Sequence, residues 1–279
     1  IYIEEGDYTL AATVNLLGST GLSGAGENTD ITGAGNFHLI TINAQDDCFV
    51  EHLHLSGTSI GNNVDCINVY ESLRPRIEDV IVTNSDRFGI YVATDDTHRG
   101  GWIINCSVTN TDLSGIIIDG IAGGTILDFI ISENYVYSVL GNGIELQDCN
   151  QITCSANVVY AASLDGIYFD NCIESTVSNN VVSYCVQHGI NNVGGDRSNI
   201  SENVCAFNDS GNTANYDGIF LDSSAFNCTV SDNLCYGNHR YGIGLGDAAT
   251  AGAYRCKIEG NYCQLNDREG IYVRGVENK

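Results

Sequence analysis

The sequence predicts an all-β chain that winds into a parallel β-helix. Three observations support this prediction. A unit of about 23 residues repeats along the chain, short runs alternate apolar and polar residues, and the chain holds 32 glycines but 1 proline. Repeats of this length indicate a stacked solenoid.

The repeat is clearest in the second half of the chain, where an asparagine is followed by a Gly-Ile pair. In five of six units nine residues separate the two, and in the unit starting at Asn203 the insertion NDSGNTANY extends this to fifteen. Earlier units keep the glycine but place Val80 and Cys106 at the asparagine position. The asparagines are Asn134, Asn157, Asn180, Asn203, Asn233 and Asn261, and the glycines are Gly143, Gly166, Gly189, Gly218, Gly242 and Gly270.

Each unit reads as short strands joined by tight turns. The runs GIYVA, GIELQ, GIYFD and GIFLD alternate inward and outward residues, and no segment sustains a helical period. Glycine suits a chain that turns several corners per coil. We expect residues 1–279 to form one domain of roughly 9 to 11 coils that stack as parallel sheets.

The recurring asparagine has a structural explanation. Equivalent residues of neighbouring coils lie about 4.8 Å apart, so side-chain amides can hydrogen-bond along the stack. We therefore expect an asparagine ladder, with a glycine where a side chain would crowd the next strand.

The opening stretch, IYIEEGDYTLAATVNLLGSTGLSGAGENTDI, resembles the first coils of the pectate-lyase-type right-handed parallel β-helix superfamily. The later units resemble the carbohydrate-binding and sugar-hydrolase repeats of that superfamily. The resemblance covers nearly the whole chain and implies a single-stranded right-handed helix. It does not select a function, because the superfamily includes lyases, hydrolases, epimerases, viral tailspikes and non-catalytic surface proteins. Solenoid ends need polar caps, so we expect the chain to be a fragment or processed core of a longer protein.

The amino-acid composition limits the classes of molecule that the protein is expected to bind. With 35 acidic and 11 basic residues the net charge is -24, which argues against nucleic acids and anionic membranes. No apolar run is long enough to span a bilayer. Twelve cysteines, together with the resemblance, favour an extracellular or cell-surface location.

The cysteines recur at matched positions in neighbouring units. Stacked cysteines lie within disulfide range. We predict staples joining Cys149 to Cys172 and Cys228 to Cys256, and a buried thiol at Cys154; the alternative is that all are reduced core residues. No cysteine or histidine spacing matches a zinc site, so no metal site is predicted.

Two outward columns follow from the alternation in the Gly-Ile strands. We expect the first to contain Asn68, Tyr91, Ile117, Glu145, Tyr168, Asn191, Phe220, Gly244 and Tyr272, and the second Tyr70, Ala93, Asp119, Gln147, Asp170, Val193, Asp222, Gly246 and Arg274. Rings among carboxylates make a sugar platform, with Tyr91, Tyr168, Phe220, Asp222 and Tyr272 as candidate binding residues. Strand propensity alone also accounts for the exposed rings.

Three carboxylates on this face are candidate catalytic groups. Asp119 and Asp170 share a column two coils apart, Glu145 lies on the coil between, and His188 is a candidate proton-transfer group. Their spacing suits paired acid and base catalysis by glycosidases. A solvated acidic face is the alternative.

Lyase and epimerase motifs are mostly missing. Lyases of the superfamily need a basic proton abstractor beside an acidic calcium cluster, and only Arg274 lies on the mapped face. No cofactor is identified, although calcium is one candidate. The insertions TDDTHRGG (94–101) and NDSGNTANY (208–216) should project as loops, because inserted residues must leave the coil to preserve register.

The resulting hypothesis is an extracellular β-helix that binds, and in one version cleaves, a polysaccharide or surface glycan along one sheet face. Whether it is an enzyme stays open. The alternative is a non-catalytic structural, surface-layer or spike/fibre protein that forms a rigid disulfide-reinforced rod. Under either hypothesis the protein could form a homo-oligomer.

Overall fold

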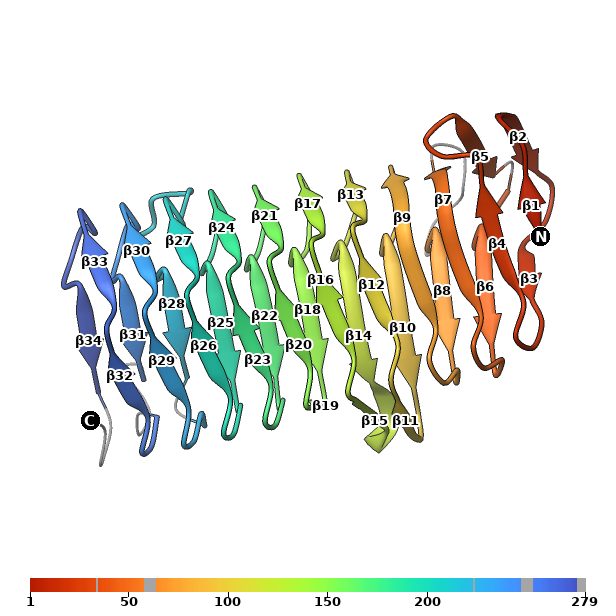
Figure 1. Ribbon diagram of the computed structural model, residues 1–279. Helices are drawn as coiled ribbons and strands as arrows, with labels where there is room; N and C mark the ends of the chain where they lie inside the picture. Colours follow the sequence, from red (N-terminus) through yellow and green to blue (C-terminus); the bar gives the residue numbers. More distant parts are fainter. Residues whose placement is uncertain (34, 58–63, 223, 247–252, 275–279) are drawn as a thin grey trace.

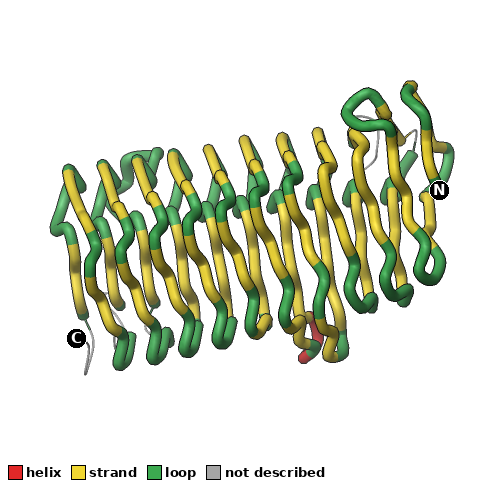
Figure 2. Tube along the Cα trace, in the orientation of Figure 1, coloured by secondary structure: helices red, strands yellow, loops and turns green. Residues whose placement is uncertain are grey.

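The computed structural model describes residues 1–33, 35–57, 64–222, 224–246 and 253–274. Coils stack along one axis, with the two termini at opposite ends (Figure 1). The predicted right-handed parallel β-helix is confirmed. Within the described residues, helix is confined to one short turn, η1 (Ile121–Gly123), at the lower edge in Figure 2, and none of their helices could span a membrane.

One sheet holds the Gly-Ile strands, all paired in parallel. Over the described residues its 11 strands are β3 (Val14–Leu16), β6 (Ile40–Asn43), β8 (Ile67–Tyr70), β10 (Ile90–Thr94), β14 (Ile116–Gly120), β18 (Ile144–Gln147), β22 (Ile167–Asp170), β25 (Ile190–Val193), β28 (Ile219–Leu221), β31 (Ile243–Leu245) and β34 (Ile271–Val273). We call its outward surface the Gly-Ile face.

A second sheet contributes two short strands from most coils. In the described part of the chain its 20 strands are β1 (Tyr2–Ile3), β2 (Gly6–Leu10), β4 (Gly21–Gly24), β5 (Thr29–Gly33), β7 (Phe49–Ser56), β9 (Arg76–Thr83), β12 (Trp102–Ile104), β13 (Ser107–Thr109), β16 (Ile130–Ser132), β17 (Tyr135–Tyr137), β20 (Thr153–Ser155), β21 (Val158–Tyr160), β23 (Thr176–Ser178), β24 (Val181–Ser183), β26 (Asn199–Ser201), β27 (Val204–Ala206), β29 (Thr229–Ser231), β30 (Leu234–Tyr236), β32 (Lys257–Glu259) and β33 (Tyr262–Gln264).

The two predicted insertions differ in structure. Residues 208–216 form a loop without strand, as expected. The 94–101 segment was predicted to be a loop, but Thr97–Arg99 forms strand β11. It pairs with β15 (Thr125–Leu127), and β15 pairs with β19 (Cys149–Asn150), in a third short sheet. The inserted residues therefore widen one corner of the coil, and their backbone N–H and C=O groups pair with the same corner of the next coil.

The core is built from stacked aliphatic columns. The isoleucine that follows each glycine faces inward and packs on its equivalent one coil away, as Ile144, Ile167 and Ile190 do with 0% exposure. Burying one such side chain contributes about 1.5–3 kcal/mol. A continuous column therefore fixes the register of the whole sheet.

The predicted asparagine ladder is confirmed. Each asparagine follows a residue with left-handed φ, such as Glu133 before Asn134, and points into the bend. The side-chain oxygen of Asn157 accepts from the backbone N–H of Asn134 at 3.0 Å, and that of Asn180 accepts from Asn157 at 2.9 Å. A second ladder, not predicted, links Asn208, Asn238 and Asn266 in the same way.

The predicted disulfides are wrong. Cys149, Cys172 and Cys228 are free thiols, so neither predicted disulfide forms. Cys149 and Cys172 do lie on matched positions of neighbouring coils, because the residues that follow them, Asn150 and Ile173, pair with each other. Cys154 is a buried thiol, as predicted, and burial raises its pKa to about 12. These cysteines act as small apolar core residues.

Candidate functional site

Both outward columns of the Gly-Ile face exist in the predicted register. Glu145 faces Ile117 on one side and Tyr168 on the other, while Gln147 lies between Asp119 and Asp170. Three carboxylates therefore occupy consecutive strands β14, β18 and β22, with a tyrosine beside them (strand order in Figure 1).

Glu145 is the most firmly held of the three carboxylates. Its Oε2 accepts from Ser114 Oγ at 2.5 Å and from Asn142 Nδ2 at 3.0 Å. Gln147 Nε2 donates to the other oxygen. Hydrogen bonds from three directions fix the position of this carboxylate.

Asp119 and Asp170 each pair with a tyrosine. Tyr91 OH donates to Asp119 at 3.4 Å, and Tyr168 OH donates to Asp170 at 3.3 Å. Burial raises the pKa of both carboxyls, the tyrosine hydrogen bonds oppose that change, and the charge of Glu145 reinforces it. The site thus combines one firmly positioned carboxylate with two aspartates whose pKa is raised above the usual value.

A third polar column, which the sequence analysis missed, lies along the same sheet. It consists of the residue before each Gly-Ile pair, and each side chain accepts from the backbone N–H of its equivalent one coil on. Asn142 bonds to Ser114 at 3.1 Å, Asp165 to Asn142 at 3.0 Å, and Asp217 to His188 at 2.8 Å. The signal was present in the sequence: five consecutive units read SGI, NGI, DGI, HGI and DGI.

His188 belongs to this buried column. Its Nδ1 accepts the Asp217 backbone N–H, so the proton of the neutral ring is on Nε2. The ring stacks on Phe220 with centroids 4.7 Å apart. Burial first, and the charge of Arg240 second, lower its pKa to about 3. His188 is thus neutral near pH 7 and, with Nδ1 engaged, can offer only an Nε2–H donor.

An ion pair lies beside this ring. Arg240 Nη2 donates to Asp217 at 2.9 Å, and the guanidinium lies over the rings of Phe220 and Tyr241. Asp217 is fully buried, and burial raises its pKa to about 7 despite Arg240.

The remaining predicted binding residues are dispersed. Tyr272 stacks on Tyr241 at 4.5 Å near the C-terminal end. Asp222 is used in a turn, where its Oδ1 accepts from the backbone N–H of Gly194 and of Ser224. The structure thus brings together Asp119, Glu145, Tyr168 and Asp170. Asp222 follows β28, two strands from Asp170, and its charge also raises the pKa of Asp170, whereas Tyr272 lies apart near the C-terminal end.

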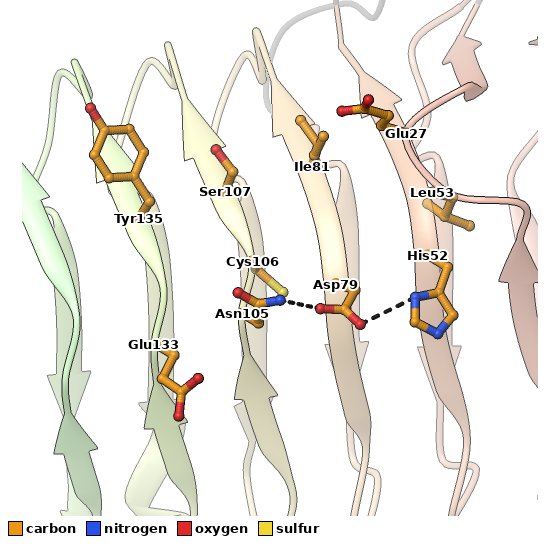
Figure 3. A pocket seen from close by; sticks show the side chains of 11 residues that line it. Glu27, His52, Leu53, Asp79, Ile81, Asn105, Cys106, Ser107, Glu133 and Tyr135 are labelled. Atoms are coloured by element: carbon orange, nitrogen blue, oxygen red, sulfur yellow. Dashed lines mark hydrogen bonds and ion pairs between the residues drawn. The ribbon is translucent and has the colours of Figure 1, made fainter.

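A pocket of about 400 Å³ lies on the 20-stranded sheet, away from the predicted residues (Figure 3). His52, Asp79 and Asn105 occupy left-handed corners of successive coils, and Asp79 binds both neighbours, with 3.2 Å to His52 Nδ1. His52 and Asp79 are well exposed, so solvent screens the pair. Among the described residues, no three His, Cys, Asp or Glu side chains gather as a metal-ligand group.

Comparisons with known proteins agree with the fold. The family model described as right handed beta helix region matches residues 38–205. A search of curated proteins found no match. The A-module of mannuronan C-5 epimerase AlgE4 from Azotobacter vinelandii is 14% identical with a TM-score of 0.73, and the alignment covers 100% of this chain and 90% of that one.

Two other solved structures are also similar. The Dettilon tailspike protein is 18% identical with a TM-score of 0.68, covering 100% of this chain and 60% of that one. The catalytic domain of a GH87 alpha-1,3-glucanase in complex with nigerose is 12% identical with a TM-score of 0.61, covering 100% and 64%. At these identities the likeness shows the fold alone.

Proposed function

This chain belongs to the right-handed β-helix family, and we propose that it binds a polysaccharide along its Gly-Ile face and hydrolyses it there. The supporting observation is the grouping of Asp119, Glu145 and Asp170 on consecutive coils, with Tyr168 beside them. The names of two structural neighbours, an epimerase of mannuronan and an alpha-1,3-glucanase, fit the same class of ligand. Such ligands also fit an extracellular or cell-surface location.

Glu145 and Asp170 divide the chemical roles in this proposal. They lie one coil apart along the stack and two residues apart along the strand, which separates their backbones by about 8 Å. Inverting hydrolysis needs carboxyl groups about 6.5–9.5 Å apart, so that a water molecule fits between acid and base, and this backbone separation is compatible with that spacing. Asp170, with its raised pKa, donates a proton to the leaving oxygen, and Glu145 activates the water. Asp119 occupies the equivalent place on the other side of Glu145.

A glycan array followed by a reducing-end assay on each glycan bound tests the proposal. We expect binding, and turnover that Glu145→Gln lowers by about 10²- to 10⁴-fold. Binding without turnover would remove the enzymatic part. Filaments or trimers with no glycan binding would favour the structural rod instead.

A further inference from the structure

A second pocket, of about 550 Å³, lies on the 20-stranded sheet. Its volume is within the range of small-ligand sites. None of the residues of the proposed polysaccharide site lines it. The lining residues are Asp47, Arg74, Arg76, Gly100, Gly101, Trp102, Asp128 and Ile130.

Arginines are concentrated here in a chain that has few cations. The chain has 11 Lys and Arg against 35 acidic residues, yet Arg74 and Arg76 line the pocket and Arg99 adjoins it. Arg74 is paired with Asp47 at 2.7 Å, and Arg99 with Asp128 at 2.9 Å. Each of these two arginines is therefore balanced by an aspartate, so the attraction of the pocket for an anion rests on Arg76.

Arg76 is different from its two neighbours. Its guanidinium carbon lies 5.1 Å from the centre of the Phe49 ring and 5.6 Å from that of Trp102, between which it is stacked by the strand register. Within the described part of the chain no carboxylate pairs with it. The two rings hold the guanidinium in place while its donors remain available, and such a fork matches a carboxylate or sulfate.

Glycine keeps the pocket open. Other coils place a side chain at this corner, as Arg74 and Asp128 show, but Gly100 stands at the equivalent position between them. Gly101 has φ +121, and a Cβ there would lie 2.6 Å from the Phe129 ring and 2.8 Å from the Pro75 carbonyl oxygen. A side chain is therefore excluded at Gly101 by the core beneath it. At Gly100 a Cβ would lie 3.1 Å from Arg74 Cγ, so it is the missing side chain of Gly100 that leaves space in the pocket.

We propose that this pocket binds an anionic sugar, meaning a saccharide ring that carries a carboxylate or sulfate. Arg76 binds the oxyanion, Trp102 and the exposed Ile130 face the apolar side of the ring, and the carboxylates of Asp47 and Asp128 accept hydroxyl hydrogen bonds. Trp102 Nε1 is buried without a hydrogen-bond partner, so it is also a donor that no described residue uses. The site is separate from the Gly-Ile face and adds to the proposed function.

Intrinsic fluorescence tests this directly, because Trp102 is the single tryptophan of the chain. Galactose, galacturonate and galactose 6-sulfate share one ring and differ at C6, so titrating each separates the role of the ring from that of the anion. We expect a saturable change with one or both charged sugars, and affinity for galactose at least tenfold lower. Comparing the two charged sugars decides between carboxylate and sulfate. A response as strong with galactose, or no saturable response to any of the three, would overturn the proposal.

Two variants locate the effect. Arg76→Gln should weaken binding of the charged sugars at least tenfold. Arg197→Gln, which changes a corner arginine on a distant coil, should leave it unchanged. Equal affinity in Arg76→Gln and wild type would contradict the assignment. Tyr168→Ala should not alter this titration, so failure here and failure of the Gly-Ile site are distinguishable.

Discussion

The side chain of Asp165 accepts a 2.8 Å hydrogen bond from the backbone N–H of His188 on the next coil. Its other oxygen accepts from Asn191 Nδ2, also at 2.8 Å. Asp165 is only 3% exposed, and burial raises its pKa to about 6 although both hydrogen bonds act in the opposite direction. The column behind the proposed site therefore contains a carboxyl group that titrates just below neutral pH.

This raised pKa makes stability depend on pH. The folded protein holds the Asp165 proton more tightly than the unfolded chain, whose Asp pKa is about 3.9, so stability falls as pH rises from about 4 to about 6. The contribution is on the order of 3 kcal/mol. We expect the melting temperature of Asp165→Asn to fall less between pH 4 and pH 7 than that of wild type. The exposed Asp112→Asn is the control, and an Asp165→Asn slope equal to that of wild type would refute this prediction.

Replacing a central ladder asparagine should destabilise the solenoid. Asn180 donates to the Cys154 carbonyl oxygen and accepts from the backbone N–H of Asn157. Asn180→Ala leaves both groups buried and unpaired, at about 1–3 kcal/mol each. Asn261→Ala, in the partly buried last rung, should cost less in a urea titration. Equal losses would show that position in the ladder does not matter.

The tyrosine next to Asp170 should set the pH range of catalysis. The hydrogen bond from Tyr168 lowers the pKa of Asp170, so Tyr168→Phe should raise it while keeping the aromatic ring. If Asp170 is the general acid, the pH at which kcat falls on the alkaline side should move upward. An unmoved alkaline limb would assign the acid to another residue.

The cysteines should be reduced and unreactive in the native state. Burial raises the pKa of Cys154 and Cys185 to about 12, which leaves little thiolate to react. Cys149, Cys172 and Cys228 are fully buried, so alkylation without reductant should label them only after unfolding. Peptide mapping that recovers disulfide-linked peptides would contradict the structure.

The repeat allowed the fold to be predicted well because a solenoid is specified locally. The spacing from Asn157 to Gly166 predicted where the next strand begins. The alternation of inward and outward residues along the strands then predicted that Glu145 lies opposite Tyr168. Each coil makes the same contacts as the coil before it. A correct assignment of one repeat unit therefore also positions the units on either side.

The site could be predicted only in part, because the repeat does not show what an outward or corner residue will contact. Asp222 looked like a platform residue, yet the turn after its strand uses its carboxylate as a cap. His188 looked like a proton carrier, but a backbone N–H from the next coil occupies its Nδ1. The Arg76 pocket depends on a glycine in a corner column that alternation does not reveal.

The central claim is that a polysaccharide binds across the Gly-Ile face near Tyr168, and calorimetry with the best glycan from an array tests it most directly. Tyr168→Ala should weaken binding about tenfold, or about 1.4 kcal/mol, with an unchanged melting temperature. Phe220→Ala is a less clean variant, because that ring also packs on His188. If no glycan binds, or if Tyr168→Ala binds as tightly as wild type, the claim is wrong.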